Sequence, residues 1–286
     1  MRKPTAFRTA ARTWLPLLAL FGLPHAASAQ RGGRGLVRDY IRDPGELAMV
    51  QKMEDALVPG FKDDVFTLAR LMYQPSGYGR GRNWQDDFPD ADVNLGWRLF
   101  QVTSLKVHPG FKYISINPKE LAGYPFTYLT ATDSLNLTPD ESAALRKYLL
   151  NGGFLMAEDF WGDRSWAHVY QEMRKIFPDR APVEIGLSHP IFHNVFDFKY
   201  LAQMPSVGVW TGYGQAYDPA DYSKDHDPHY YAVYDDKNRM MVLICRNNHF
   251  GDGWEHEGDD HSYFDHFSEP QAYPMFINIL FYAMTH

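Results

Sequence analysis

The chain has a single cysteine, Cys245, among its 286 residues. One thiol cannot form a disulfide within the chain, so the fold has to be stabilised by its core alone, and a chain of this length can bury a sufficient core. Cys245 lies in the apolar run 240–245. We therefore interpret it as a small buried hydrophobic residue and not as a reactive thiol.

Acidic residues are missing from the beginning of the chain, where none precedes Asp39. An apolar run, 14–23, is followed by Ala27-Ser28-Ala29, and the run is preceded by Arg2, Lys3, Arg8 and Arg12. This order of charge, apolar run and small residues is typical of a secretory signal peptide, here residues 1–29. An uncleaved anchor is the weaker alternative, because the run has about half of the ~20 residues that span a bilayer.

Positive charge is in deficit, and the net charge is -7. Removal of the predicted signal peptide would make the chain more acidic still. An acidic exported protein is not expected to bind nucleic acid or anionic membrane surfaces, because their negative charges repel its own. No later apolar stretch is long enough to span a membrane. We therefore expect a periplasmic or secreted protein whose partner is a protein of the cell envelope or a small molecule.

The order of apolar patterns predicts an α/β fold with a mostly parallel sheet and helices on both faces. Strands are expected at 65–73, 112–116, 125–130 and 154–158, and helices at 46–57, from Asp90, from Thr138, from 162 to 177 and at the C-terminus. The segments 230–234 and 239–246 flank a polar turn and predict an antiparallel hairpin near the C-terminus. The predicted organisation is a signal peptide at 1–29, a leader with a short helix at 30–60, and one α/β domain at 61–286.

The segment 152–162 combines two glycines, a buried strand, the acids Glu158 and Asp159, and the start of a helix. Open α/β sheets bind ligands at the carboxyl ends of their strands. In nucleophile-elbow enzymes this type of turn carries the nucleophile. The sequence therefore predicts a catalytic scaffold with an acid where the nucleophile would stand.

Several segments together resemble one bacterial family, the domain of unknown function 4159 family. They are 66–73, 84–92, 124–126, 149–159, 176–178, 189–192 and 247–255. The resemblance implies a flavodoxin-like fold similar to that of the class I glutamine amidotransferases. The family has no established activity, and the amidotransferase cysteine would fall near Glu158 and Asp159. Because neither is a cysteine, the resemblance does not predict glutaminase activity.

The candidate catalytic residues are two acids and two histidines, Glu158, Asp159, His189 and His249. Acids at the end of an apolar strand are costly unless they are exposed, paired or coordinating. One of them is expected to act as a general base or metal ligand. The alternative is structural, with Asp159 capping the next helix and Glu158 paired with an arginine. For His189 the alternative is a hydrogen bond to the backbone of its own loop.

The candidate ligand-binding residues lie on the first strand and after the last core strand: Arg70, Tyr73, Asn248, Asp252 and Trp254. Arg70 stands in the middle of an apolar strand and needs an acidic partner. We expect that partner to be Glu158 or Asp159. The polar segment 247–255 is expected to face the same crevice as those acids, and its glycines permit a tight turn.

No metal site is predicted, and the sequence indicates no particular cofactor. The acids and histidines at 256–266 match no metal-binding spacing and are interpreted as a solvated loop. Asp86, Asp87, Asp90 and Asp92 lack the spacing of a calcium loop. Helix capping from Asp90 explains that group more simply.

Two functions follow from these features. The first is a non-catalytic module that binds a ligand or a protein, because neither cysteine nor serine stands at the strand–helix turn. The second is a metal-assisted hydrolase that uses Asp159 with His189 or His249, because acids and imidazoles are predicted at one sheet edge. The sequence favours the first function and does not indicate whether the protein is an enzyme.

The signal peptide can be tested directly. Export should remove residues 1–29, so that the protein begins at Gln30. The intact mass and the N-terminal sequence of protein recovered from the exported fraction check this. A product that retains the segment 1–29 would instead support the uncleaved anchor.

Overall fold

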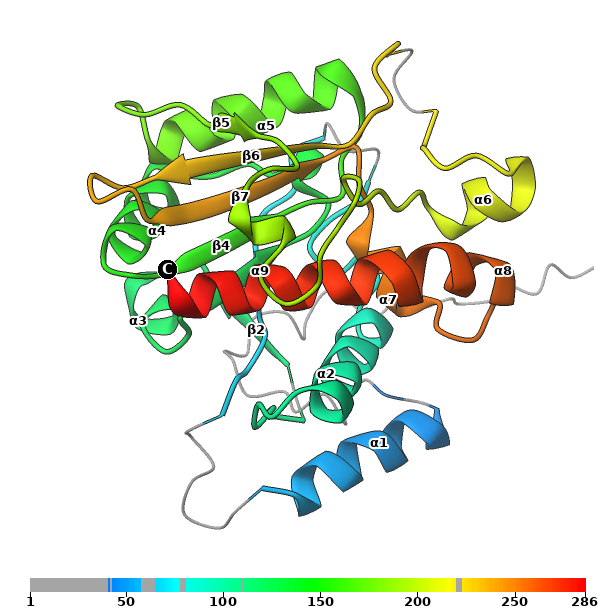
Figure 1. Cartoon of the computed structure of the whole chain (residues 1–286). Coiled ribbons are helices and arrows are strands. Elements are labelled where there is room, and N and C mark those ends of the chain that lie inside the picture. The colour runs from blue at the N-terminus through cyan, green and yellow to red at the C-terminus, as the bar shows by residue number, and fades with distance from the viewer. Residues whose placement is uncertain (1–40, 42, 58–64, 78–80, 110, 220–222) are drawn as a thin grey trace, which may run out of the picture. The chain divides into compact units, whose positions relative to one another are not determined.

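Seven strands form one mixed sheet in the part of the chain that the computed structural model describes, residues 41, 43–57, 65–77, 81–109, 111–219 and 223–286 (Figure 1). The strand order is β2-β1-β3-β4-β7-β6-β5. The strands are β1 Ala69–Met72, β2 Lys112–Ser115, β3 Phe126–Leu129, β4 Phe154–Ala157, β5 Val183–Ile185, β6 His229–Tyr234 and β7 Met240–Arg246. The predicted signal peptide and most of the predicted leader lie outside the described residues.

Five strands of this sheet are parallel and two complete it in antiparallel pairings. β1 pairs with β2 and β3, and β4 pairs with β3 and β7, all in parallel. β6 runs antiparallel to both β7 and β5. The α/β fold, the mostly parallel sheet and the C-terminal hairpin are thus confirmed. The hairpin also does more than extend the sheet, because β7 is buried along its whole length next to β4.

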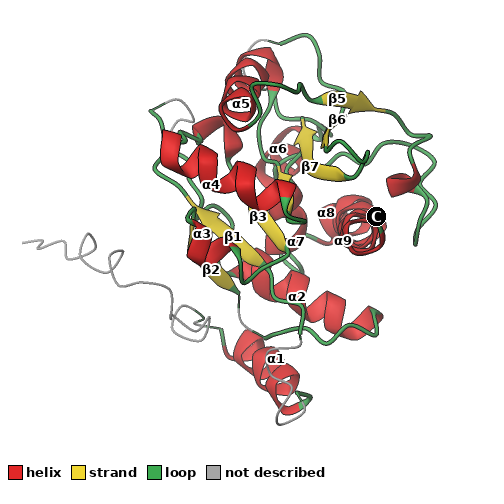
Figure 2. Ribbon diagram, turned by 90° about the vertical axis from the view of Figure 1, so that its left-hand side faces the viewer, coloured by secondary structure: helices red, strands yellow, loops and turns green. Residues whose placement is uncertain are grey.

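Helices cover both faces of the sheet (Figures 1 and 2). One face packs against α3 Pro118–Leu121, α4 Pro139–Leu150 and α5 Gly162–Ile176 through a core that includes Leu71, Leu155 and Ile244. The other face packs against α1 Pro44–Asp55, α2 Asp90–Val102, α7 Phe250–Glu255 and α9 Tyr273–Thr285 through a core that includes Tyr128, Met156 and Cys245. Successive strand residues alternate between these cores, as the pleat requires.

Local sequence signals explain where several helices begin. The Thr138 side chain accepts from the Glu141 amide, the Glu141 carboxylate accepts from the Thr138 amide, and Pro139 occupies the first helical position of α4. This is the capping box that the sequence predicts. Asp43 caps α1 in a related way, by accepting from the amides of Gly45 and Glu46.

The remaining helical segments are short, apart from the C-terminal one. η2 Thr132–Ser134 follows β3, η3 Pro190–Phe192 follows β5, and α6 Val207–Tyr213 precedes β6. α8 His261–Tyr263 and the π-helical η5 Phe264–Ala272 lead directly into α9. The predicted C-terminal helix is thus present as α9, and the helical segments that lead into it begin at His261.

The first strand is shorter than predicted. It begins at Ala69, and Phe66 forms only an isolated bridge with Val107. Cys245 is fully buried, as expected from its apolar run. None of the helices in the described ranges combines the length and the apolar character needed to cross a bilayer.

His229 provides a pH-dependent link between the edge strand and its neighbour. Its ring nitrogens lie 2.6 Å from Glu184 Oε1 on β5 and 3.0 Å from Asp225 Oδ2. Burial alone would lower the pKa of His229, but the hydrogen bonds to Glu184 and Asp225 outweigh it and raise that pKa above its usual value. The protonated histidine therefore stabilises the folded state.

We expect the stability gained from His229 to be present below its unfolded-state pKa of about 6.5 and to disappear as the pH rises through the raised folded-state pKa. His229→Gln should therefore lower the free energy of unfolding more at pH 6 than at pH 9, by about 0.5 kcal/mol for a partly exposed pair. Urea unfolding at both pH values measures this. His261→Gln, on an exposed helix end, is the control, and an equal loss at both pH values would contradict the assignment.

Candidate functional site

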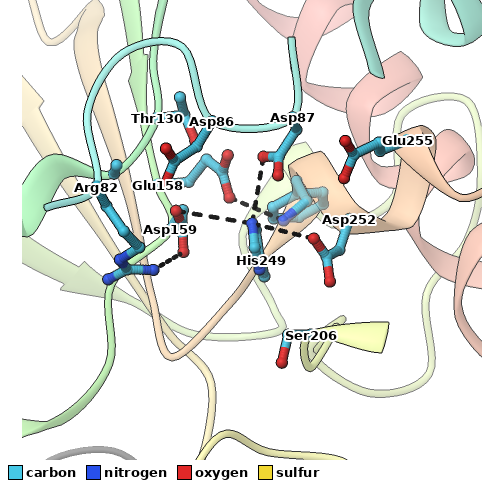
Figure 3. A network of polar contacts seen from close by, with 12 residues as sticks. Arg82, Asp86, Asp87, Thr130, Glu158, Asp159, Ser206, His249, Asp252 and Glu255 are labelled. Carbon is cyan, nitrogen blue, oxygen red and sulfur yellow. Dashed lines mark hydrogen bonds and ion pairs between the residues drawn. The ribbon is translucent and has the colours of Figure 1, made fainter. Parts of the chain in front are cut away.

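Polar side chains from four crossover segments meet beyond the carboxyl ends of the parallel strands (Figure 3). Arg82 and Asp87 come from the segment after β1, Asp133 follows β3, Asp159 follows β4, and His249 follows β7. Parallel strands deliver their carboxyl ends to the same edge, which is where open α/β sheets bind ligands. The sheet thus brings together residues far apart in the sequence.

His249 is the centre of this group. Its Nε2 lies 3.2 Å from Asp87 Oδ2, 3.4 Å from Asp252 Oδ1 and 3.6 Å from Asp159 Oδ2. The four side chains are between 0 and 10 % exposed. Figure 3 shows the three carboxylates around the imidazole on different sides. One buried imidazole nitrogen therefore faces three buried carboxylates.

The backbone around this group is held in an uncommon conformation. Among the described residues, five that are not glycine have positive φ, and four of them lie in these segments: Asp87, Ala131, Asp159 and Asn247. Asp159 has a φ of 58° between the end of β4 and the start of α5. Left-handed backbone at non-glycine residues is costly and is concentrated at functional sites. The tight strand–helix turn predicted at Asp159 is therefore present.

Gly251 allows Asp87 to approach His249. A Cβ atom at position 251 would lie 1.9 Å from Asp87 Oδ2, well inside contact distance. Only glycine leaves room for that carboxylate, so the Gly-rich segment after β7 and the segment after β1 fit each other closely.

Arg82 links two of the acids at the more open side of the site. Its Nη1 donates to Asp159 Oδ1 at 2.6 Å and its Nη2 donates to Asp133 Oδ2 at 2.7 Å. The arginine side chain is 32 % exposed, whereas Asp159 is fully buried. Arg82 is thus the most exposed charged group in contact with these buried acids.

Glu158 lies beneath the site and fixes its geometry. Its carboxylate accepts from the Tyr128 hydroxyl and, at 2.8 Å, from the Phe250 amide. Burial, followed by the nearby Asp159, raises the pKa of Glu158 to about 8. Because Phe250 begins α7, this bond fixes the helix start between His249 and Asp252. We therefore assign Glu158 a positioning role.

The charges of the group are strongly coupled. Burial alone would lower the pKa of His249, but Asp159, Asp252 and Asp87 outweigh it and hold that pKa well above its usual value. Burial opposes ionisation of Asp87, yet His249 keeps the pKa of Asp87 below its usual value. Burial raises the pKa of Asp252 to about 7. The three carboxylates therefore stabilise the protonated, positively charged form of the His249 imidazole.

Several buried polar atoms in these segments lack a hydrogen-bond partner. Ten such side-chain atoms occur in the described part of the chain, and eight of them lie in the segments 130–134, 159–161 and 246–254. They are Thr130 Oγ1, Asp133 Oδ1, Ser134 Oγ, Asp159 Oδ2, Trp161 Nε1, Arg246 Nε, His249 Nδ1 and Trp254 Nε1. Buried polar groups are nearly always paired, so this concentration marks the edge as unusual.

The partner expected for Arg70 is corrected by the structure. Arg70 pairs with Asp92 on α2, with Nη2 2.6 Å from Oδ2 and Nε 3.2 Å from Oδ1, and not with Glu158 or Asp159. Its Nη1 donates to the carbonyls of Trp84 and Asp86. The sheet order explains the difference, because β3 lies between β1 and β4, and Glu158 is held instead by Tyr128 and the Phe250 amide, whereas α2 places Asp92 beside Arg70. Arg70 thereby holds the segment that carries Asp87.

The other predicted ligand-binding residues serve the framework, except Asp252. Tyr73 donates its hydroxyl to the carbonyls of Thr130 and Ala131. Asn248 accepts from the Met204 amide. Trp254 is 1 % exposed and packs against Tyr128, Phe250 and Phe276. These side chains position the site without facing it.

His189 does not join His249. Its Nδ1 accepts from the Ile191 amide, its Nε2 lies 3.2 Å from the Tyr234 hydroxyl, and its ring contacts Tyr282. Tyr234 pairs with Met240 at the start of β7, whereas His249 follows the end of β7. His189 therefore lies toward the opposite edge of the sheet, and the backbone hydrogen bond weighed as its alternative is present.

Three site residues were missed by reasoning from the sequence. Asp87 was assigned to a helix start, although the first turn of α2 contains Asp90 and Asp92 and its cap is Pro89. Arg82 and Asp133 were not singled out. The usable signal was the pair Asp86-Asp87 just before a helix, combined with the glycine at 251, but only the fold shows that the two segments touch.

One surface hollow lies elsewhere and offers less chemistry. It has a volume of about 450 Å³, lies between α3 and α4, and is lined by largely apolar residues that include Leu121, Tyr124 and Tyr148. Its one charged lining residue is Lys147. A hollow without an acid–base pair is a weaker candidate for catalysis than the enclosed group around His249.

The fold and this site define an α/β protein with a buried imidazole–carboxylate group at the carboxyl edge of its sheet. A family model described as Domain of unknown function (DUF4159) matches residues 67–284. The match covers most of the chain and every residue of the group, and the chain belongs to this family. The comparison with curated proteins found no match.

The buried Arg70–Asp92 pair gives a stability prediction. Arg70→Met should lower the free energy of unfolding by about 3–5 kcal/mol, because it leaves Asp92 charged and unpaired in the core. Urea unfolding followed by circular dichroism measures this. Arg146→Met, which removes an exposed arginine paired with Asp179, should have a much smaller effect.

The double variant Arg70→Met/Asp92→Leu tests the pairing itself. It should be less destabilised than the sum of the two single variants, because neither charge is left alone. Additive losses would contradict a direct coupling between the two side chains.

Proposed function

We propose that this protein is a hydrolase whose reacting groups are Asp159 and His249. The observation that carries the proposal is the contact of one buried imidazole with three buried carboxylates at the carboxyl edge of the sheet. Such a group costs folding energy, and titratable groups with perturbed environments are concentrated at functional sites. The left-handed backbone at Asp159 adds a second cost of the same kind.

The nucleophile in this proposal is water. Cys245 is buried within β7, where burial raises the pKa of its thiol well above the usual value. The hydroxyl of Ser206, the serine labelled in Figure 3, donates to Asp218. A mechanism without an enzyme nucleophile needs a base, and Asp159 Oδ2 is a buried carboxylate oxygen that accepts no hydrogen bond.

The reaction can be written with few steps. Asp159 accepts one proton from water while the water oxygen bonds to an electrophilic carbonyl carbon or phosphorus. The bond to the leaving group then breaks, and Asp159 returns the proton to that group. The negative charge that develops on the substrate is stabilised by a positive charge at His249 Nε2. This charge would belong to the protonated imidazole or to a cation held by that nitrogen.

The alternative of a non-catalytic binding module stays a prediction. The missing cysteine or serine at the strand–helix turn supports it. A binding module, however, gives no reason why three acids should converge on one imidazole, and we therefore prefer the hydrolase. We also retain the proposal of an exported protein with a partner in the cell envelope or a small-molecule ligand.

We further propose that the domain is flavodoxin-like, as in the class I glutamine amidotransferases. The order β2-β1-β3-β4-β7 supports this, because it corresponds to the order 2-1-3-4-5 of flavodoxin-like sheets. On this proposal β6 and β5 are additions at one end of that sheet. An experimental structure compared with flavodoxin-like proteins tests it, and a different connectivity of the five parallel strands would contradict it.

Substitution of Asp159 tests the hydrolase. The full chain is assayed against p-nitrophenyl acetate, p-nitrophenyl phosphate and bis(p-nitrophenyl) phosphate. Asp159→Asn should lower kcat/KM on the substrate that is turned over by about 10²–10⁴-fold, because the amide cannot accept the proton.

Asp236→Asn provides the matched control, since this acid is 89 % exposed on the β6–β7 turn, away from the carboxyl edge. It should retain full activity. Equal activity of Asp159→Asn and wild type, both folded, would refute the assigned base. Two results together would favour the binding module. The wild-type protein would turn over none of the three probes, and it would be isolated in a stable complex with a protein partner and without a small-molecule ligand.

A further inference from the structure

The side chains nearest His249 have the composition of a metal-binding site. We infer that Asp87, His249 and Asp252 hold one divalent transition-metal ion, through Asp87 Oδ2, His249 Nε2 and Asp252 Oδ1. These three ligand atoms all lie within 4.8 Å of one another. The inference concerns the site of the proposed function and rests on it only for the role of Asp159.

The distances fit a shared ion. Nε2 lies 3.2 Å from Asp87 Oδ2 and 3.4 Å from Asp252 Oδ1. An ion bound at about 2.1 Å to each donor places neighbouring donors about 3.0–3.4 Å apart, in octahedral or tetrahedral geometry. The two nitrogen–oxygen separations therefore need little change to accommodate the ion.

Asp159 gives independent support. Its Oδ1 is paired with Arg82, but its Oδ2 is fully buried, has no hydrogen-bond donor and points at His249 Nε2 from 3.6 Å (Figure 3). A buried carboxylate oxygen without a donor is costly unless a cation or a water on that cation faces it. Asp159 would then stand beside the ion, in the position of a base for bound water.

The balance of charge points the same way. Six carboxyl groups lie in this region, and the positive side chains within ion-pair distance of them are Arg82, His249 and the partly exposed His256, which lies 4.0 Å from Asp252. The acids are Asp86, Asp87, Asp133, Glu158, Asp159 and Asp252. Acids this close together in a buried region need compensation beyond one guanidinium and two imidazoles. A divalent ion that replaces the proton on His249 Nε2 adds one net positive charge at the point where the carboxylates converge.

The framework already orients the donors. Asp252 Oδ2 accepts from the Val207 amide at 2.6 Å, which leaves Oδ1 directed toward His249. Gly251 leaves the space into which Asp87 Oδ2 projects. In metal sites, hydrogen bonds to the ligating side chains fix the orientation of those side chains. The three donors come from two segments that the Arg70 and Glu158 contacts hold in place.

The donor set indicates which ions fit. One imidazole nitrogen and two carboxylate oxygens suit zinc or manganese. Calcium requires about six to eight oxygen ligands, and an imidazole is not among them. Three protein donors also leave coordination positions open, as in catalytic sites and unlike closed structural sites.

A neighbouring group shares Asp252 but is a weaker candidate. It consists of Asp252, Glu255 and His256. Glu255 and His256 are each 25 % exposed and pair with one another at 2.9 Å, and His256 also pairs with Asp259. Their contacts are satisfied without an ion, so we use them to discriminate between the two positions.

The experiment measures ion binding without turnover. The full chain is purified without chelator and analysed by native mass spectrometry, then dialysed against EDTA and titrated with ZnCl₂ or MnCl₂ by calorimetry. We expect one ion per chain. Asp87→Asn and Asp252→Asn should each weaken binding by at least about 100-fold, since even the loss of a group that only orients a ligand costs about 10–100-fold in metal affinity.

Asp252→Asn is the variant best suited to remain folded, because the amide oxygen can still accept from Val207. Gly251→Ala keeps every donor but displaces Asp87, and it should also weaken binding. Glu255→Gln, His256→Gln and Asp236→Asn are controls that should bind like wild type. Circular dichroism of each variant establishes that the fold is retained.

Two results would overturn the inference. One is a wild-type chain that binds neither ion stoichiometrically. The other is binding that Glu255→Gln or His256→Gln abolishes while folded Asp87→Asn keeps it. Stoichiometric binding without hydrolysis of any probe would support the ion site and count against the proposed function.

Discussion

The arrangement at the carboxyl edge depends on the compensation of buried negative charge. Asp87, Asp159 and Asp252 reach the same imidazole nitrogen from three separate segments, and burial leaves little water to screen them. His249 and Arg82 neutralise part of this charge. The group can persist only because the surrounding framework is stable enough to hold the acids together, so the fold and the proposed chemistry are linked through one electrostatic cost.

The framework meets that cost with contacts one layer below the site. Glu158 joins Tyr128 on β3 to the start of α7, and Arg70 joins β1 to α2 and to the segment that carries Asp87. Neither side chain faces the reacting groups. Each fixes the backbone from which those groups project, which preorganises the site before any ligand binds. We therefore interpret Arg70 on β1 and Glu158 just after β4 as residues that position the site.

The geometry of the site is the reason why we prefer the hydrolase to the binding module. The missing cysteine or serine excludes a covalent mechanism through a thiol or a hydroxyl at the strand–helix turn, and on its own it favours simple binding. The convergence on His249 changes this, because a divalent ion or a protonated imidazole can act on water without an enzyme nucleophile. The proposed ion would be held by Asp87 and Asp252 together with His249, whereas the proposed base is Asp159.

The local elements of this protein and the position of its strand–helix turn follow from the sequence alone. Helix caps such as Thr138, the hairpin before β7 and the acids at 158–159 depend on neighbouring residues, so their signals are local. Tertiary structure alone decided which acid pairs with Arg70, that His189 and His249 lie apart, and that Asp87 reaches His249 across Gly251. These contacts join segments separated by up to 162 residues, as for Asp87 and His249. The sheet order that brings such segments to one edge is set by the packing of both cores, which no local pattern encodes.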